Sequence, residues 1–272
     1  MKLKSVRVIF CSATGTTKKI VRAVCAGLDD CDLHYQDITT PGNRKNPIGI
    51  ISEDLLILAL PVYEERIPPF VKDSLNSMIG QGQPAIAIGV YGNVGFGVIL
   101  PEIQTLLKQR GFVTIAGAAF VGEHSFSHDK LPVAVGRPNA EDLLHAKKFG
   151  NEIAEYLQSY PDNGFDPKRL LNGKLPLMAR ILPANSSKLF ADFPYYKSNL
   201  CDQCGVCYKK CPVGAIDPIT MVTDDHLCTR CFACVRYCPK NARRIQLKNT
   251  LIVKLFFRKV QKVNKVPYWE FL

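Results

Sequence analysis

Eight of the eleven cysteines fall between residues 201 and 238, in two runs of identical spacing. Within each run the gaps are two, two and three residues, and a proline follows the last cysteine. The runs are Cys201, Cys204, Cys207 and Cys211-Pro212, then Cys228, Cys231, Cys234 and Cys238-Pro239. Three closely spaced thiolates can bind three corners of an iron–sulfur cube, whose fourth ligand must come from elsewhere. Zinc is the alternative, but it takes two Cys-x2-Cys pairs brought together. The spacing favours two [4Fe–4S] clusters.

Both runs resemble those of two-cluster bacterial ferredoxins, in which the fourth cysteine of each run binds the other cluster. This resemblance implies crossed ligand sets: Cys201, Cys204, Cys207 and Cys238 for one cluster, and Cys228, Cys231, Cys234 and Cys211 for the other. It also implies a small α+β ferredoxin domain, which we assign to residues 195–248.

A second candidate site lies near the start of the chain. A predicted strand over Val6–Phe10 runs into a loop rich in hydroxyl groups, made of Ser12, Ala13, Thr14, Gly15, Thr16 and Thr17. Backbone N–H groups at the start of a helix, together with hydroxyls, can hold a phosphate. The Walker A and Gly-x-Gly-x-x-Gly patterns are absent. The loop resembles the FMN phosphate loop of flavodoxins, and a Ser/Thr-rich helix cap is the alternative.

Two further loops follow predicted strands at the places where flavodoxins hold the flavin ring. The candidate cofactor-binding residues there are Pro61, Val62, Tyr63, Tyr91, Gly92, Asn93 and Gly95. Each loop supplies an aromatic ring for stacking, and the glycines allow close backbone approach. Ordinary packing is the alternative for both tyrosines. The pattern departs from the family at Glu64 and Glu65, where many flavodoxins have a glycine whose peptide turns over on flavin reduction.

The elements that position these loops alternate between strand and helix. We expect strands at 6–10, 32–37, 54–60, 84–90 and 112–121, and helices at 16–28, 68–78, 97–109 and 139–160 with Asn139 as N-cap. The run at 54–60 is continuously apolar, as in a strand buried on both faces. This alternation predicts a doubly wound α/β parallel sheet, with ligands beyond the carboxyl ends of its strands.

The whole chain resembles a flavodoxin domain fused to a two-cluster ferredoxin, the architecture of the EFR1-type ferredoxin family of anaerobes. The resemblance implies strand order 2-1-3-4-5 and FMN as a cofactor.

We expect a flavodoxin-like domain at 1–160, a packed linker at 161–194 and a basic amphipathic tail at 249–272. The linker is rich in proline but also apolar. In the tail, Lys254, Arg258, Lys262 and Lys265 share one helical stripe. We expect the tail to dock on the flavodoxin-like domain, with a membrane surface as the alternative.

Charge is distributed unevenly over the 272 residues. Residues 1–160 hold 16 Lys/Arg and 16 Asp/Glu, whereas residues 161–272 hold 19 and 8, so the net charge of +11 lies in the second part. Two anionic clusters would offset some of this positive charge, and the region has no set of aromatic residues on which bases could stack. Both observations disfavour nucleic-acid binding. We expect acidic redox proteins as partners.

With neither an 18-residue apolar run nor a secretory signal in this sequence, we expect a cytoplasmic protein without a transmembrane segment.

These features predict an electron carrier that relays electrons between FMN and two [4Fe–4S] clusters in anaerobic metabolism. No side chain needs to act as a catalytic acid or base. The first alternative is a flavin-dependent reductase of a small molecule, with a pocket over the flavin formed by Tyr63, His124, Phe126 and His128. The second is a relay subunit of a larger oxidoreductase.

Overall fold

The computed structural model describes residues 3–28, 30–159, 171–175, 185–248 and 251–272. Its main sheet has five parallel strands and one antiparallel strand, in the order β10-β7-β6-β4-β1-β2. These strands are β1 (Ser5–Phe10), β2 (Asp32–Asp37), β4 (Leu55–Pro61), β6 (Pro84–Tyr91), β7 (Val113–Val121) and β10 (Tyr268–Phe271). The parallel strands follow the flavodoxin-like order 2-1-3-4-5, which confirms the predicted fold class.

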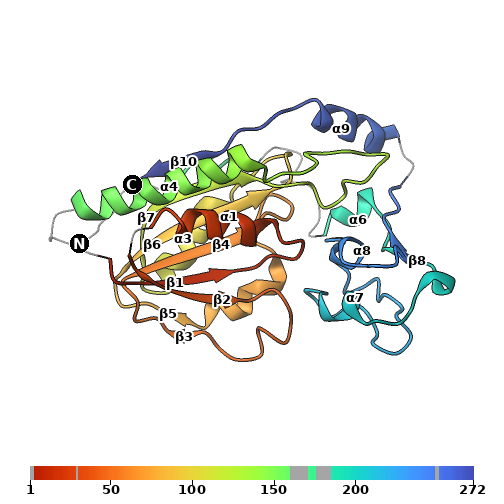
Figure 1. The fold of residues 1–272 in the computed structure, drawn as a ribbon, viewed down its shortest axis with the longest axis horizontal. Coiled ribbons are helices and arrows are strands. Elements are labelled where there is room, and N and C mark those ends of the chain that lie inside the picture. Colours follow the sequence, from red (N-terminus) through yellow and green to blue (C-terminus); the bar gives the residue numbers. More distant parts are fainter. Residues whose placement is uncertain (1–2, 29, 160–170, 176–184, 249–250) are drawn as a thin grey trace.

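Helices cover both faces of this sheet (Figure 1). Helices α1 (Thr16–Cys25) and α4 (Ala140–Ser159) pack together on one face, while α2 (Lys72–Asn76) and α3 (Ile99–Gln109) cover the other. Helix α1 buries Ile20, Val21 and Val24, which recur at helical spacing. Strand β4 is buried on both faces along nearly its whole length, as its apolar run predicted.

The start of α4 shows how local chemistry fixes an element. The Asn139 side chain accepts a hydrogen bond from the Asp142 N–H at 3.0 Å, and the Asp142 carboxylate accepts one from the Asn139 N–H at 2.9 Å. This reciprocal arrangement is a capping box, which satisfies two N–H groups at the helix start. The predicted N-cap is therefore confirmed.

Two predicted helices differ most from the structure. Helix α1 ends at Cys25 instead of Leu28, and the segment predicted as a helix over 68–78 divides into a 3₁₀ turn, η1 (Pro69–Val71), and α2. Two prolines, Pro68 and Pro69, restrict the backbone at this start. The chain then enters β5 (Met78–Ile79), which pairs with β3 (Gly49–Ile50) in a separate two-stranded sheet.

The cysteine-rich region forms a small lobe beyond the carboxyl ends of the parallel strands (Figure 1). Its elements are α6 (Ser187–Phe190), β8 (Tyr195–Tyr196), η2 (Ser198–Leu200), α7 (Val206–Lys209), α8 (Ala233–Arg236) and β9 (Arg243–Arg244). Strands β8 and β9 pair antiparallel and bring together the two ends of this region. The lobe therefore stands at the edge where ligands of open parallel sheets bind.

The tail docks on the protein in two parts. Helix α9 (Leu251–Gln261) buries Val253, Phe257 and Val260 in an apolar cluster with Phe126 and Phe232, so it touches both lobes. Strand β10 then pairs with β7, an element the sequence reasoning missed. Three of the four predicted basic residues, Arg258, Lys262 and Lys265, are exposed; the side chain of Lys254 lies outside the described part.

Only part of the predicted linker falls within the described residues. Leu171 is buried against Gly117 of β7, and its N–H donates to the Gln104 side chain at 2.7 Å. Leu175 is half-buried, and the remaining apolar residues that carry the predicted packing, Leu170, Leu177, Met178, Ile181 and Leu182, lie outside the described residues. No helix among the described residues is long and apolar enough to span a bilayer.

Candidate functional site

The two cysteine runs fold into equivalent turns. The residue two positions after the first cysteine has a positive φ in both, 57° at Gln203 and 57° at Arg230. A second positive φ follows the second cysteine, at Gly205 (74°) and Phe232 (53°), immediately before the helical turns α7 and α8. Repeated left-handed residues curl each loop tightly, so that its first three thiols face one side.

The fourth cysteine of each run accepts a backbone hydrogen bond from its own loop. The Ala215 N–H donates to the Cys211 sulfur at 3.3 Å, and the Ala242 N–H donates to the Cys238 sulfur at 3.2 Å. Such N–H donors stabilise negative charge on sulfur and are one of the means by which proteins tune iron–sulfur potentials.

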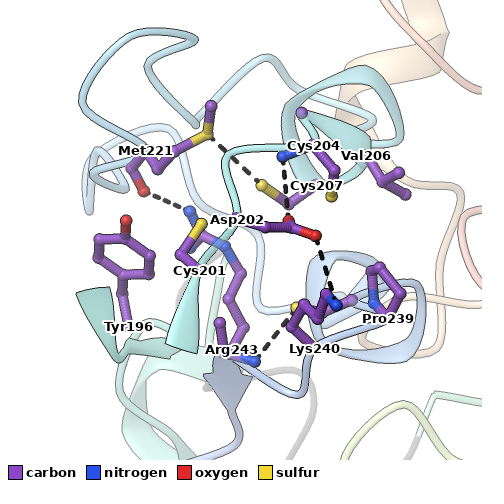
Figure 2. Close-up of a pocket in the computed structure, with 13 residues that line it drawn as sticks. Tyr196, Cys201, Asp202, Cys204, Val206, Cys207, Met221, Pro239, Lys240 and Arg243 are labelled. Atoms are coloured by element: carbon purple, nitrogen blue, oxygen red, sulfur yellow. Dashed lines mark hydrogen bonds and ion pairs between the residues drawn. The ribbon is translucent and has the colours of Figure 1, made fainter. Parts of the chain in front are cut away.

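The eight thiols surround two hollows. The first cavity is lined by four cysteines: Cys201, Cys204 and Cys207, which Figure 2 labels, and Cys238. The second cavity is lined by the other four: Cys211, Cys228, Cys231 and Cys234. The fourth cysteine of each run thus lies with the first three of the other run, in the two sets that the ferredoxin resemblance implied. Within the described ranges, no group of three or more His, Cys, Asp or Glu side chains is arranged for a single metal ion.

The two cavities differ in exposure. In the first, Cys204 is exposed and Cys201 and Cys238 are half-buried, whereas all four cysteines of the second are buried. Burial raises the pKa of the Cys231 thiol to about 12. A thiolate buried at this position needs a compensating positive charge, which the iron of a cluster would supply. The donor set fits a [4Fe–4S] cluster.

The hydroxyl-rich loop lies between β1 and α1, as predicted. Gly15 is the N-cap of α1 with φ 90°, and the Ser12 hydroxyl accepts a hydrogen bond from the Lys18 N–H at 3.0 Å. The Thr17 hydroxyl is fully buried and has no hydrogen-bond partner among the described residues. A buried hydroxyl without a partner is costly unless a ligand engages it. This orphaned group beside a helix start fits a phosphate, as FMN would provide.

The two loops predicted to bind the flavin ring have different surroundings. Tyr63, after β4, is covered by the cysteine-rich lobe and packs against Cys231 and Ala233. Tyr91, after β6, is only 4% exposed and packs edge-on against Phe96 in the core. The Asn93 amide donates to the backbone oxygens of Val260 and Val263 in the tail, at 3.2 and 2.7 Å.

The remaining residues of these loops are held closely. Gly92 lies against the ring of His124, and Gly95 lies against the Glu65 carboxylate. Val62 donates its N–H to the Val90 oxygen at 2.8 Å, directly after Pro61 ends β4. The loop residues Thr14 and Thr16 lie beside Gly15, and Thr16 contacts Gly122 at the end of β7.

Glu64 and Glu65 adopt the backbone conformation that glycine favours, with φ of 53° and 65°. The Glu64 carboxylate accepts hydrogen bonds from the N–H groups of Asn185 (2.8 Å) and Ser187 (3.0 Å), at the start of the cysteine-rich lobe. Burial raises the pKa of Glu65, whose Oε2 has no partner among the described residues. The position at which this chain departs from the flavodoxin pattern is thus a contact between the two lobes.

Several residues that sequence reasoning missed join the two lobes. Arg44 donates to the Pro212 oxygen at 2.6 Å, and Arg236 pairs with Glu123 at 2.8 Å. The Tyr237 hydroxyl lies over Gly15, and Ala13 packs in one cluster with Cys231 and Ala233. These contacts join residues more than 100 positions apart, and no local pattern marks them.

Comparison with known proteins agrees with the cysteine chemistry. Residues 194–217 match a family described as "4Fe-4S binding domain", so the chain contains such a domain. No curated protein matches the chain.

Several solved structures are similar to the flavodoxin-like part. A flavodoxin from the domain Archaea is 17% identical, covers 57% of this chain and 99% of its own, and has a TM-score of 0.40. The FMN-bound flavodoxin of Fusobacterium nucleatum is 15% identical, with 57% and 99% covered and a TM-score of 0.38. A flavone reductase is 9% identical, with 60% and 66% covered and a TM-score of 0.43.

The crossed arrangement of the cavities predicts which cluster depends on Cys211. Cys211→Ala should lose the second cluster, because this thiol lines the second cavity. Iron and sulfide content and the electron paramagnetic resonance (EPR) spectrum should then match those of Cys234→Ala. The buried α1 thiol lies outside both cavities, so Cys25→Ala should keep full content. A Cys211→Ala spectrum that matches Cys207→Ala would contradict the crossed ligand sets.

Proposed function

We propose that this protein is an electron carrier that relays electrons between FMN and two [4Fe–4S] clusters. One observation carries the proposal: Cys231 of the second cavity packs in one cluster with Ala13 of the hydroxyl-rich loop and Tyr63 of the loop after β4. A cluster in the second cavity would thus adjoin the residues that hold the flavin. When bound, FMN exchanges one or two electrons and each cluster exchanges one.

The burial of the two cavities supports an order for the relay. All four cysteines of the second cavity are buried and Cys231 lies against the flavin loops, whereas the first cavity has an exposed cysteine, Cys204. Electrons would enter or leave through the first cluster and pass through the second to reach FMN. The protein's own residues fix these positions, and none needs to donate a proton. An anaerobic setting follows from the resemblance and stays a prediction.

The reductase alternative has no observation in its favour. Three of the four residues suggested for a pocket over the flavin are covered, Tyr63 by the cysteine-rich lobe and His124 and Phe126 by α9. Burial also lowers the pKa of His124 to about 4, so its imidazole is neutral at pH 7 and supplies no acid.

Transfer between cluster and flavin should be intramolecular. After flash reduction of the loaded protein by one electron, flavin reduction should be first order and independent of protein concentration. Arg44→Ala removes the hydrogen bond to Pro212 and should slow this step, because electron transfer slows steeply with distance. Arg22→Ala, at an exposed position on α1, should not slow it. A rate proportional to protein concentration would refute the relay.

The Thr17 hydroxyl should contribute directly to FMN binding. A hydrogen bond to a charged group is worth about 1.5–3 kcal/mol, so Thr17→Val should weaken binding roughly 10- to 100-fold. Titration of flavin-free protein with FMN, followed by flavin fluorescence, measures this. Thr105→Val is the matched control, since its exposed hydroxyl bonds the Pro101 oxygen within α3. Equal FMN affinity in both variants would remove Thr17 from the proposed phosphate site.

We further propose that acidic redox proteins dock near the first cavity. Lys240 lines this cavity and is exposed, and Lys209 is another exposed basic side chain of the same lobe. Opposite charges speed encounter and are screened by salt.

The rate of electron exchange with an acidic bacterial ferredoxin should therefore fall as salt rises. Lys240→Gln should lower this rate at low salt, whereas Lys147→Gln, on α4 of the other lobe, should not. A salt-independent rate, with Lys240→Gln equal to the parent protein, would exclude docking by charge at this face.

A further inference from the structure

A buried arginine lines the first cavity. Arg243 of β9 is only 2% exposed and lies beside the four cysteines of that cavity (Figure 2). Its guanidinium donates to the Thr223 hydroxyl at 2.8 Å and to the Met221 backbone oxygen, and it stacks on the ring of Tyr196 at 5.2 Å. All three of these partners are electrically neutral.

A buried positive charge is costly unless an anion compensates it. The second run offers a direct contrast, since Arg230 is also buried but pairs with the carboxylate of Asp225. Within the described residues, no ion pair to Arg243 is found. The acid that also lines the first cavity, Asp202, is exposed and instead pairs with Lys240 at 3.8 Å. The remaining candidate for the counter-charge is therefore the content of the cavity itself.

An iron–sulfur cluster would match this charge. An oxidised cube with its four thiolates carries a net charge of about −2, and reduction adds one more negative charge. A fixed positive charge beside the cavity stabilises the reduced form more than the oxidised form, which raises the reduction potential. Solvent acts in the same direction, because the first cavity has an exposed ligand and the second has none.

We infer that Arg243 is the counter-charge of the first cluster and sets its reduction potential above that of the second. This inference rests on the proposed cluster sites but does not depend on FMN. Electrons on the protein would then reside mainly on the exposed first cluster, which a partner can reach. Arg243 also lies within electrostatic range of Cys234, so the second cluster should respond in the same direction but less.

The test is a redox titration of the loaded protein, with each cluster followed by EPR. Arg243→Gln should lower the reduction potential of the first cluster by about 59 mV, which corresponds to a tenfold change in the one-electron reduction equilibrium. Arg243→Lys keeps the charge and should restore most of the shift. The matched control is Arg244→Gln, which removes an exposed charge from the adjacent residue and should shift neither midpoint appreciably. Cys204→Ser, at an exposed ligand, identifies the signals of the first cluster.

A second variant covers the case in which Arg243→Gln fails to assemble its cluster. Thr223→Asp leaves the guanidinium in place but gives it a carboxylate partner, and it should lower the same midpoint. Iron and sulfide content separates the two levels of the proposal: a parent protein without clusters would overturn the proposed function. If Arg243→Gln keeps both clusters and their midpoints are unchanged, this inference alone is overturned. If Arg243→Gln lacks its cluster, unchanged midpoints in Thr223→Asp overturn it instead.

Discussion

Strand β10 returns the end of the chain to the flavodoxin-like sheet, and the position of the cysteine-rich lobe depends on this return. The strand pairs with β7 from Tyr268 to Phe271, and the Trp269 ring stacks on Phe120 beneath it. Before the lobe, Leu171 packs on the same strand, β7. The intervening chain is therefore attached to one strand at both ends, which restricts the lobe to the nearby edge of the sheet.

Packing against the sheet also supplies apolar contacts that the lobe lacks by itself. Around the first cysteine run, the core of the cysteine-rich lobe consists mainly of cysteines with Ala215, Ile216 and Met221. Small domains with so little apolar burial usually need metal or a partner surface for stability. Here α9 contributes Phe257 to a cluster that includes Phe126 of one lobe and Phe232 of the other. The tail thus contributes side chains to an apolar core that the two lobes share.

The same docking arranges the candidate cofactor sites in sequence. The hydroxyl-rich loop after β1, the Tyr63 loop and the second cavity meet at Cys231, while the first cavity has an exposed cysteine, Cys204. A burial gradient of this kind suits a relay, because the innermost site is shielded and the outermost can contact a partner. The buried arginines differ along the gradient as well, with Arg230 paired and Arg243 facing the outer cavity.

The sequence by itself determined the features that depend on local chemistry. Alternating apolar segments predicted the doubly wound sheet, Asn139 predicted the start of α4, and cysteine spacing predicted iron–sulfur chemistry. The crossed cysteine sets came only from resemblance. Tertiary structure decided that Tyr91 enters the core, that Asn93 binds the tail, and that Arg44 holds the second lobe. These outcomes depend on packing or on partners distant in the chain, and short-range periodicity carries no record of such partners.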